Sequence, residues 1–144
     1  MKILITALLL SLSIFGVAIA EGVTHHVAIH VDENDPKVMN MALNNVVNLT
    51  NYYESQGDTV QVELVAYGPG LNMFIEGKSP VADRISVLSL ELENLSFSAC
   101  GNTHRKMSAK AGHEIALMSE ATVVPSGVVR LIELQENGYA YVRP

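Results

Sequence analysis

Residues 94–104 read Asn94-Leu95-Ser96-Phe97-Ser98-Ala99-Cys100-Gly101-Asn102-Thr103-His104, and the other predicted elements are arranged around this stretch. Apolar residues at every second position, Leu95, Phe97 and Ala99, indicate a buried strand. The strand ends at Cys100, the single cysteine of the chain.

The residues after Cys100 predict a tight turn into a helix. Gly101 permits the turn, and Asn102 or Thr103 can accept hydrogen bonds from the first free amides of a helix that continues from His104. A thiol in this place faces the positive end of a helix dipole, which favours the thiolate. Cys100 is therefore the candidate catalytic nucleophile, the backbone of Gly101, Asn102 and Thr103 the candidate anion-binding group, and His104 a candidate proton partner. The alternative is an inert thiol, because unpaired cysteine is often buried as a small apolar residue.

Strands and helices alternate along the remaining chain. Strands are expected at residues 27–31, 59–67, 95–100, 121–124 and 139–142. Asp35-Pro36 and Ser79-Pro80 are typical helix starts. Helices are expected over 36–56, 80–92, 104–111, 114–118 and 128–135, whereas residues 71–77 give no clear signal.

This alternation predicts the α/β class, with a mostly parallel five-stranded sheet in a three-layer α/β/α sandwich. The strand order stays open. The turns that follow parallel strands meet at the carboxyl edge of the sheet, where open α/β folds bind their ligands. Asp32, Gly68 and Ser126 are therefore candidate ligand-binding residues beside Cys100.

Residues 1–20 resemble a secretory signal peptide. Lys2 precedes an apolar run, and Ala18-Ile19-Ala20 is a typical cleavage signal before Glu21. We therefore expect an exported, periplasmic protein whose residues 21–144 form one domain, with no membrane attachment after cleavage. A retained membrane anchor is the alternative.

Charge and motif content exclude several function classes. Without Lys2, eight basic residues stand against 15 acidic ones, a balance that disfavours nucleic acid and anionic membranes as partners. No dinucleotide motif is present, and no cofactor is expected. His26 and His30 share one face of a strand but lie about 13 Å apart, so no metal site is expected and metal binding ranks lowest.

Three motifs together resemble the DsrE/DsrF-like (YchN-like) sulfur-relay family. They are FSACGNT at residues 97–103, VVPSGV at 123–128 and LQENGYAYVRP at 134–144. The resemblance implies an α/β/α domain that assembles as a homo-oligomer. It also implies a persulfide on Cys100 that is exchanged with a donor or acceptor protein or with a small sulfur species.

Two hypotheses follow from these observations. The first is an exported sulfur carrier or thiol-redox accessory protein that uses Cys100, and both a passive carrier and a sulfurtransferase-like enzyme fit it. The second is a non-catalytic, oligomeric module of the same fold that binds a small ligand or a protein at the same edge. Reactivity of Cys100 in the folded protein distinguishes them.

Overall fold

The computed structural model describes residues 22–144, which form a five-stranded sheet with helices on both faces. The signal segment expected at residues 1–20 lies outside the described residues. The strands are β1 (Thr24–Val31), β2 (Thr59–Ala66), β3 (Leu95–Cys100), β4 (Ala121–Val124) and β5 (Ala140–Val142). They pair in the order β4-β3-β2-β1-β5, and every pair is parallel. The predicted fold class is confirmed.

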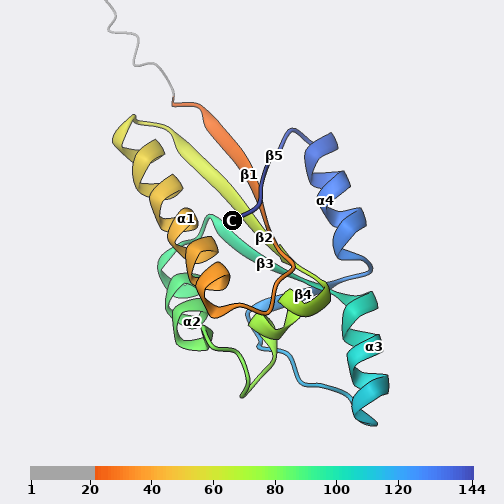
Figure 1. Ribbon diagram of the computed structural model, residues 1–144. Helices are drawn as coiled ribbons and strands as arrows, with labels where there is room; N and C mark the ends of the chain where they lie inside the picture. Colours follow the sequence, from red (N-terminus) through yellow and green to blue (C-terminus); the bar gives the residue numbers. More distant parts are fainter. Residues whose placement is uncertain (1–21) are drawn as a thin grey trace, which may run out of the picture.

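The helices form the two outer layers (Figure 1). Helices α1 (Pro36–Ser55) and α2 (Ala82–Glu91) cover one face of the sheet, and α4 (Gly127–Glu136) covers the other. Helix α3 (Gly101–Ala111) leaves the end of β3 and extends beyond the carboxyl edge of the sheet. Helical crossovers are what parallel neighbours require, because a tight hairpin cannot connect them.

The two faces of the sheet differ in what they bury. The larger apolar core, with fully buried Ile29, Leu64 and Leu43, lies on the side of α1 and α2. The α4 side holds a small apolar cluster of Ala28, Val65, Leu131 and Leu134. The buried polar strand residues also lie on the α4 side; they are His30, Glu63 and Ser98.

Helix α1 begins as predicted. The Asp35 carboxylate accepts a hydrogen bond from the Lys37 amide at 2.8 Å, and proline occupies the first turn. Within α1, Met39 and Leu43 are fully buried, whereas Met41 between them is 47% exposed. Apolar residues adjoin one another here, so packing against the sheet decides which of them is buried.

The loop without a clear signal contains the 3₁₀ helix η1 (Gly68–Phe74). Its Leu71 and Phe74 side chains are fully buried. At Gly70 a Cβ would lie 2.3 Å from the Val31 carbonyl oxygen, so only glycine lets η1 pass this close to the end of β1.

The helical turn expected over residues 114–118 is absent. Leu117 pairs antiparallel with Ile75, and the Met118 amide donates to the Phe74 carbonyl at 2.9 Å. The prediction was wrong because a short apolar run fits a helix and an extended segment equally well. Backbone pairing with the end of η1 selects the extended form.

No helix within residues 22–144 is long and apolar enough to cross a membrane.

Candidate functional site

Cys100 ends β3 at the carboxyl edge of the sheet. Successive side chains of a strand point to opposite faces, so Phe97 and Ala99 pack on the α1–α2 side and Cys100 faces α4. The residue is 4% exposed. The strand predicted at residues 95–100 is therefore confirmed, with Phe97 and Ala99 in the core. The Cys100 thiol lies beneath the first turn of α4.

Helix α3 begins at Gly101, three residues earlier than expected, and Cys100 itself is its N-cap. The Cys100 Sγ atom accepts the Thr103 amide at 3.5 Å, so Asn102 and Thr103 lie in the first turn rather than capping it. The position of the cap was wrong because asparagine and threonine are usual caps and cysteine is not. The consequence is that the helix amides meet the sulfur directly.

A second helix N-terminus reaches the same sulfur. Gly127 is the first residue of α4, and its amide contributes to lowering the pKa of Cys100. A Cβ on Gly127 would lie 3.1 Å from the Cys100 Cβ and 3.0 Å from Tyr67 atoms, so glycine permits this contact. Ser126, a predicted ligand-binding residue, is the N-cap of α4 but makes no side-chain capping bond.

These contacts decide the ionisation of the thiol. Burial raises the pKa of Cys100, but hydrogen bonds from the Thr103 hydroxyl and from the amides of Gly127, Thr103 and Asn102 outweigh it. The net effect is a pKa below the ordinary value of a cysteine. Cys100 therefore has the hydrogen-bond environment of a thiolate.

Thr103 connects this environment to η1. Its hydroxyl oxygen accepts the Gly68 amide at 2.9 Å, which orients the hydroxyl proton for donation to the Cys100 sulfur. Of the predicted residues, the structure thus brings Gly68, Gly101, Asn102 and Thr103 together at the thiol.

His104 has a different partner. Its Nε2 atom lies 2.6 Å from the carbonyl oxygen of Ile115, in the segment that follows α3. This bond ties the ring to the chain beyond α3 and not to the sulfur. The hydrogen-bond geometry therefore gives no support to His104 as the proton partner of Cys100.

His30 is a buried histidine on the same face and at the same edge. It is 4% exposed, its Nδ1 atom lies 2.7 Å from the Tyr141 hydroxyl, and its Nε2 atom has no hydrogen-bond partner within the described chain. The ring packs on Tyr67 with 4.4 Å between centroids. Burial lowers the pKa of His30; Asp32 opposes this shift and Arg143 adds to it. His30 is therefore a neutral imidazole at neutral pH.

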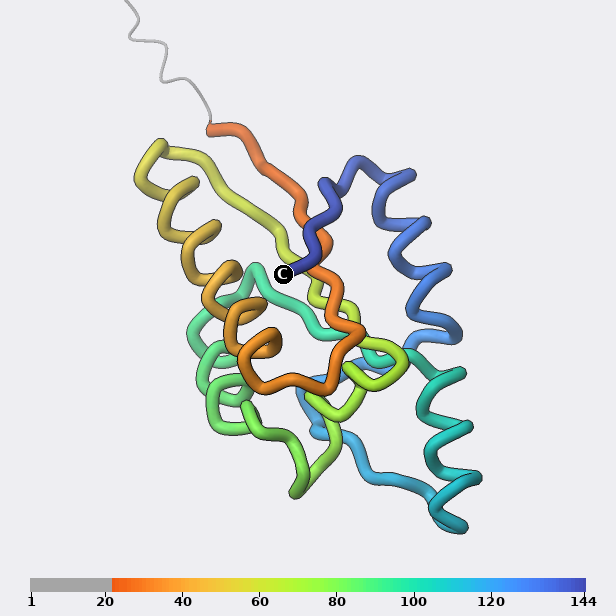
Figure 2. Tube along the Cα trace, in the orientation of Figure 1, coloured from red at the N-terminus to blue at the C-terminus, as the bar shows by residue number. Residues whose placement is uncertain are grey.

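Asp32 lies at the end of β1 in an ion pair with the C-terminal segment. Arg143 contacts the Asp32 carboxylate at 3.0 Å and Glu33 at 3.0 Å. Figure 2 shows the C-terminal segment lying beside β1, with which β5 pairs. Asp32, a predicted ligand-binding residue, is thus paired with Arg143 at this edge of the sheet.

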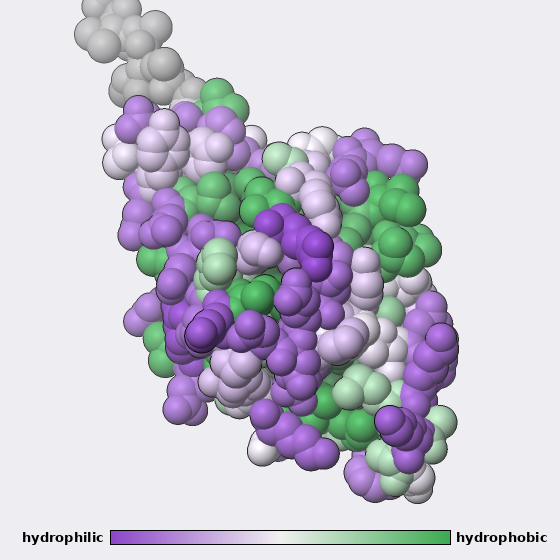
Figure 3. Space-filling model, in the orientation of Figure 1, coloured by the Kyte–Doolittle hydropathy of each residue, from purple (hydrophilic) through white to green (hydrophobic). Residues whose placement is uncertain are grey.

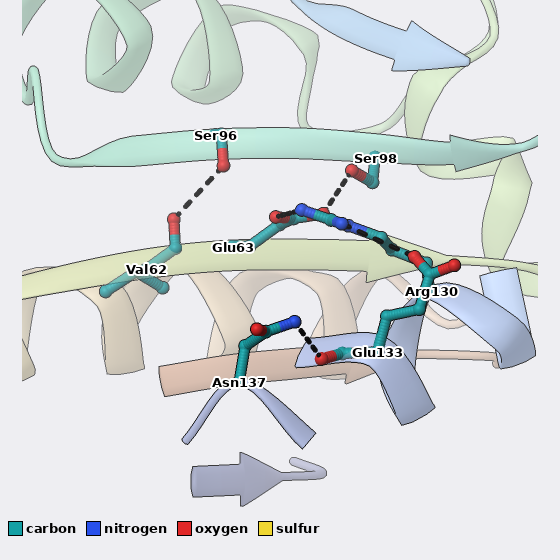
Figure 4. Close-up of polar contacts among 7 residues, drawn as sticks. All are labelled: Val62, Glu63, Ser96, Ser98, Arg130, Glu133 and Asn137. Carbon is teal, nitrogen blue, oxygen red and sulfur yellow. Dashed lines mark hydrogen bonds and ion pairs between the residues drawn. The ribbon is translucent and has the colours of Figure 1, made fainter. Parts of the chain in front are cut away.

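A partly buried ion pair holds α4 on the sheet (Figure 4). Arg130 of α4 donates to both carboxylate oxygens of Glu63 at 2.7 Å, and the Ser98 hydroxyl donates to the same carboxylate at 2.6 Å. Burial raises the pKa of Glu63, but the bonds from Arg130 and Ser98 outweigh it and lower the pKa. Because α4 carries Gly127, this pair fixes one of the donors to Cys100.

The described residues hold no group of three or more His, Cys, Asp or Glu side chains suited to a metal ion. His25 bonds Asp58 at 3.1 Å and stacks on Tyr53, and His26 packs against Tyr139. The histidines near the start of β1 therefore have separate partners.

Sequence reasoning missed two members of the site: His30 and Tyr67. His30 was considered only as a metal ligand, yet its place one residue before the end of β1 puts it at the carboxyl edge. The register pairs Ala66 with Ala99, so the next residue, Tyr67, lies beside Cys100. Strand pairing was the missing signal, because the sequence leaves strand order open.

Comparisons with known protein families and with curated proteins give no match. A solved structure does match: a protein of unknown function, MTH1491, from Methanobacterium thermoautotrophicum, which is 31% identical to this chain. The match covers 83% of this chain and 99% of that chain, with a TM-score of 0.68. The fold described above is thus shared along nearly the whole of a natural relative.

Proposed function

We propose that this chain, which belongs to the same family as the Methanobacterium thermoautotrophicum protein MTH1491, is a sulfur carrier or thiol-redox accessory protein. Cys100 is the acceptor and holds the transferred sulfur as a persulfide. The observation that carries the proposal is the set of donors around one sulfur atom, which comes from the first turns of two helices and from the Thr103 hydroxyl.

The same donors suit both states of a carrier. In the empty state they stabilise the thiolate, which is the nucleophilic form of cysteine. In the loaded state the outer sulfur of a persulfide is also an anion, and helix N-termini favour bound anions. A persulfide forms when the thiolate attacks the sulfane sulfur of a donor and the rest of the donor leaves with the bonding electrons.

The resemblance of residues 97–103, 123–128 and 134–144 to DsrE/DsrF-like proteins supports the same chemistry. Export of the chain, with cleavage before Glu21, is part of the proposal. An exported copy would exchange sulfur with a periplasmic protein or a small sulfur species, with no nucleic acid involved.

Mass spectrometry of the folded chain tests the proposal. After exposure to inorganic polysulfide or to a persulfidated protein, we expect a mass gain of one sulfur atom on Cys100. The variant Cys100→Ser should show no gain. Failure of every donor to modify Cys100, while a control thiol is modified, would refute the carrier function.

The second candidate is an oligomeric binding module, and the outer surface of α4 favours self-association. Val128, Val129 and Ile132 are each about half exposed, as is Val123 of the neighbouring strand β4. Figure 3 shows an apolar patch on the molecule where α4 lies in Figure 1. Contiguous exposed apolar residues commonly mark an interface. Under this alternative, Cys100→Ser retains binding and Cys100 resists alkylation in the native protein.

A further inference from the structure

Helix α3 is the most basic element of an otherwise acidic chain. It contains Arg105, Lys106 and Lys110 and no acidic residue, so it holds three of the eight basic residues that remain without Lys2. The helix dipole favours Lys110 in the last turn, but Lys106 and Lys110 are four residues apart and repel each other. Without acids the helix has no internal ion pairs. The stability of α3 therefore does not explain this concentration of charge.

Only the inner face of α3 packs against the rest of the molecule. Beyond Gly101 no residue of the helix is fully buried. Ser108 accepts the Ile115 amide, His104 bonds the Ile115 carbonyl, and Met107 packs against the apolar core. The exposed residues recur at helical spacing on the other side and form the outer face of α3: Asn102, Arg105, Lys106, Ala109 and Lys110.

The cations of this outer face are not paired with carboxylates. Within residues 22–144, ion pairs with arginine are formed by Arg130 and Arg143, each with two acids, and none is formed by a cation of α3. The three charges are therefore available to a partner.

The outer face begins beside the turn that carries Cys100. The Arg105 guanidinium reaches back along the helix and bonds the neutral side chain of Asn102. Its Nη1 atom lies 3.4 Å from the point that a Cβ on Gly101 would occupy, and Gly101 directly follows Cys100. A molecule bound to the outer face therefore lies next to the carboxyl edge of the sheet.

The spacing of the cations indicates an extended, anionic occupant. Arg105 and Lys110 are five residues apart, which is about 7.5 Å along the helix axis. A single small anion does not span that distance, whereas carboxylates on a protein segment do. A membrane fits less well, because interfacial helices bury large apolar side chains and the outer face offers only Ala109.

The charge of the whole chain distinguishes acidic proteins from nucleic acid. Duplex nucleic acid carries one charge about every 1.7 Å, so its dense charge would also meet the acidic surface of the chain. At physiological salt, charges interact over about 8 Å, so a protein segment with a few carboxylates responds mainly to the cations that it touches.

We propose that the outer face of α3 binds an acidic segment of a partner protein through Arg105, Lys106 and Lys110. The acidic surface elsewhere repels such a partner, so charge determines the place and orientation of docking more than its strength. This interaction goes beyond the persulfide chemistry proposed above and does not depend on it.

Disulfide tethering at the centre of the outer face tests the proposal. Ala109→Cys in a Cys100→Ser background supplies one thiol there, and its rate of disulfide exchange is measured with a Glu-rich and a Gln-rich peptide that each carry one activated cysteine. We expect the Glu-rich peptide to react about tenfold faster, and the ratio to approach one in about 0.5 M salt. Comparing two peptides on one thiol cancels the effect of the cations on the pKa of that thiol.

Charge variants identify the residues responsible. Arg105→Gln, Lys106→Gln and Lys110→Gln together should abolish the preference for the Glu-rich peptide, and glutamine retains nearly the same helix propensity. Lys37→Gln with Lys78→Gln removes exposed cations elsewhere and should leave the preference unchanged.

A thiol away from α3 shows whether the preference is local. At Leu90→Cys, on the exposed surface of α2, the Glu-rich peptide should have no advantage. Equal rates for both peptides at Ala109→Cys, or the same preference at Leu90→Cys, would overturn the proposal.

Two measurements examine the other occupants. We expect the triple glutamine variant to elute from a sizing column with the natural chain, and the natural chain not to sediment with phosphatidylglycerol vesicles. A changed elution volume in the variant would assign the outer face to a second copy of the chain. Sedimentation that the variant loses would assign it to an anionic membrane. Either result overturns the assignment to an acidic protein.

Discussion

At the scale of single residues, the Thr103 hydroxyl is the strongest of the hydrogen-bond donors that lower the pKa of Cys100. We expect Thr103→Val to raise this pKa and to slow iodoacetamide alkylation at neutral pH by about three- to tenfold, because the thiolate fraction falls. The Gly68 amide also loses its acceptor, which should cost about 1 kcal/mol of stability. The alkylation rate measured across a pH series gives the pKa.

The control for this change is Thr103→Ser, which keeps the hydroxyl and removes a methyl group. Its pH profile should stay close to that of the natural chain. If Thr103→Val alkylates with an unchanged pH midpoint, the hydroxyl does not stabilise the thiolate, and the two helix N-termini alone account for the lowered pKa.

His30 makes the stability of the fold depend on pH. Burial lowers its pKa, so below about pH 6.5 the unfolded chain takes up a proton that folded His30 does not. The unfolded state then binds more protons, and the free energy of unfolding falls as the pH decreases. The groups that face His30 are Asp32, Arg143, Tyr67 and Tyr141.

We expect the His30 contribution to fall by at most about 1.4 kcal/mol per pH unit between the unfolded pKa near 6.5 and the lower folded pKa. Urea denaturation at closely spaced pH values measures this slope. His30→Gln should remove its share of the slope. The pKa values of Glu63 and Asp58 are also lowered, but these carboxyl groups change the free energy of unfolding only below about pH 4.5. They therefore do not contribute to the slope assigned to His30. An identical slope in His30→Gln would contradict the assignment.

The residues of the site were predictable where helix-start chemistry or the carboxyl-edge rule applies; that rule placed Gly68 at the site although it lies far from Cys100 in the chain. Cys100, Thr103 and the turn between them are neighbours in sequence, so helix-start chemistry identified them. Tyr67 and His30 lie far from Cys100 in the chain and reach this edge of the sheet through strand pairing. Periodicity does not report which strands are neighbours, and so their positions could not be inferred.

At the scale of secondary structure elements, α4 depends on the Glu63–Arg130 pair for its position. We expect Arg130→Met to destabilise the fold by about 2–3 kcal/mol because it leaves a buried carboxylate. This is less than for a fully buried pair, since the Arg130 side chain is 34% exposed. The Cys100 pKa should also rise, because Gly127 moves with α4. Urea denaturation and alkylation measure the two effects.

Two further variants distinguish the loss of the Glu63–Arg130 pair from the loss of an exposed charge on α4. Glu133→Gln removes the exposed, 3.5 Å partner of Arg130 and should change stability by no more than about 0.5 kcal/mol. Replacing Glu63 and Arg130 together by leucine and methionine should recover most of the stability lost in Arg130→Met. Equal stability of Arg130→Met and Glu133→Gln would show that the pair does not hold α4.

The elements themselves were predicted well where their signals are long. The five strands and α1 follow from periodicity and from the cap formed by Asp35 with Pro36. The failures are short segments: η1, the start of α3, and residues 114–118. Each adopts its conformation through backbone contacts with another segment, such as the pairing of Leu117 with Ile75. Such contacts have no local sequence signature.

At the scale of the whole molecule, the apolar outer surface of α4 argues for self-association. Val128, Val129 and Ile132 of α4 are each about half exposed and lie beside the exposed Val123 of β4, so the apolar residues of this outer surface adjoin one another. We expect the chain of residues 21–144 to elute from a sizing column as a homo-oligomer and Ile132→Glu to elute as a monomer, because burying an unpaired carboxylate in an interface is costly.

The matched control is Leu90→Glu, which places the same charge on α2, where Leu90 is 86% exposed on the opposite side of the sheet. It should leave the elution volume unchanged. A monomeric natural chain would contradict the prediction outright, and loss of assembly in Leu90→Glu would move the interface to α2.

The comparison also bears on the thiol, because an interface on α4 lies on the helix whose first amide lowers the pKa of Cys100. If assembly fixes that turn, Ile132→Glu should raise the Cys100 pKa together with the elution volume, whereas Leu90→Glu should change neither.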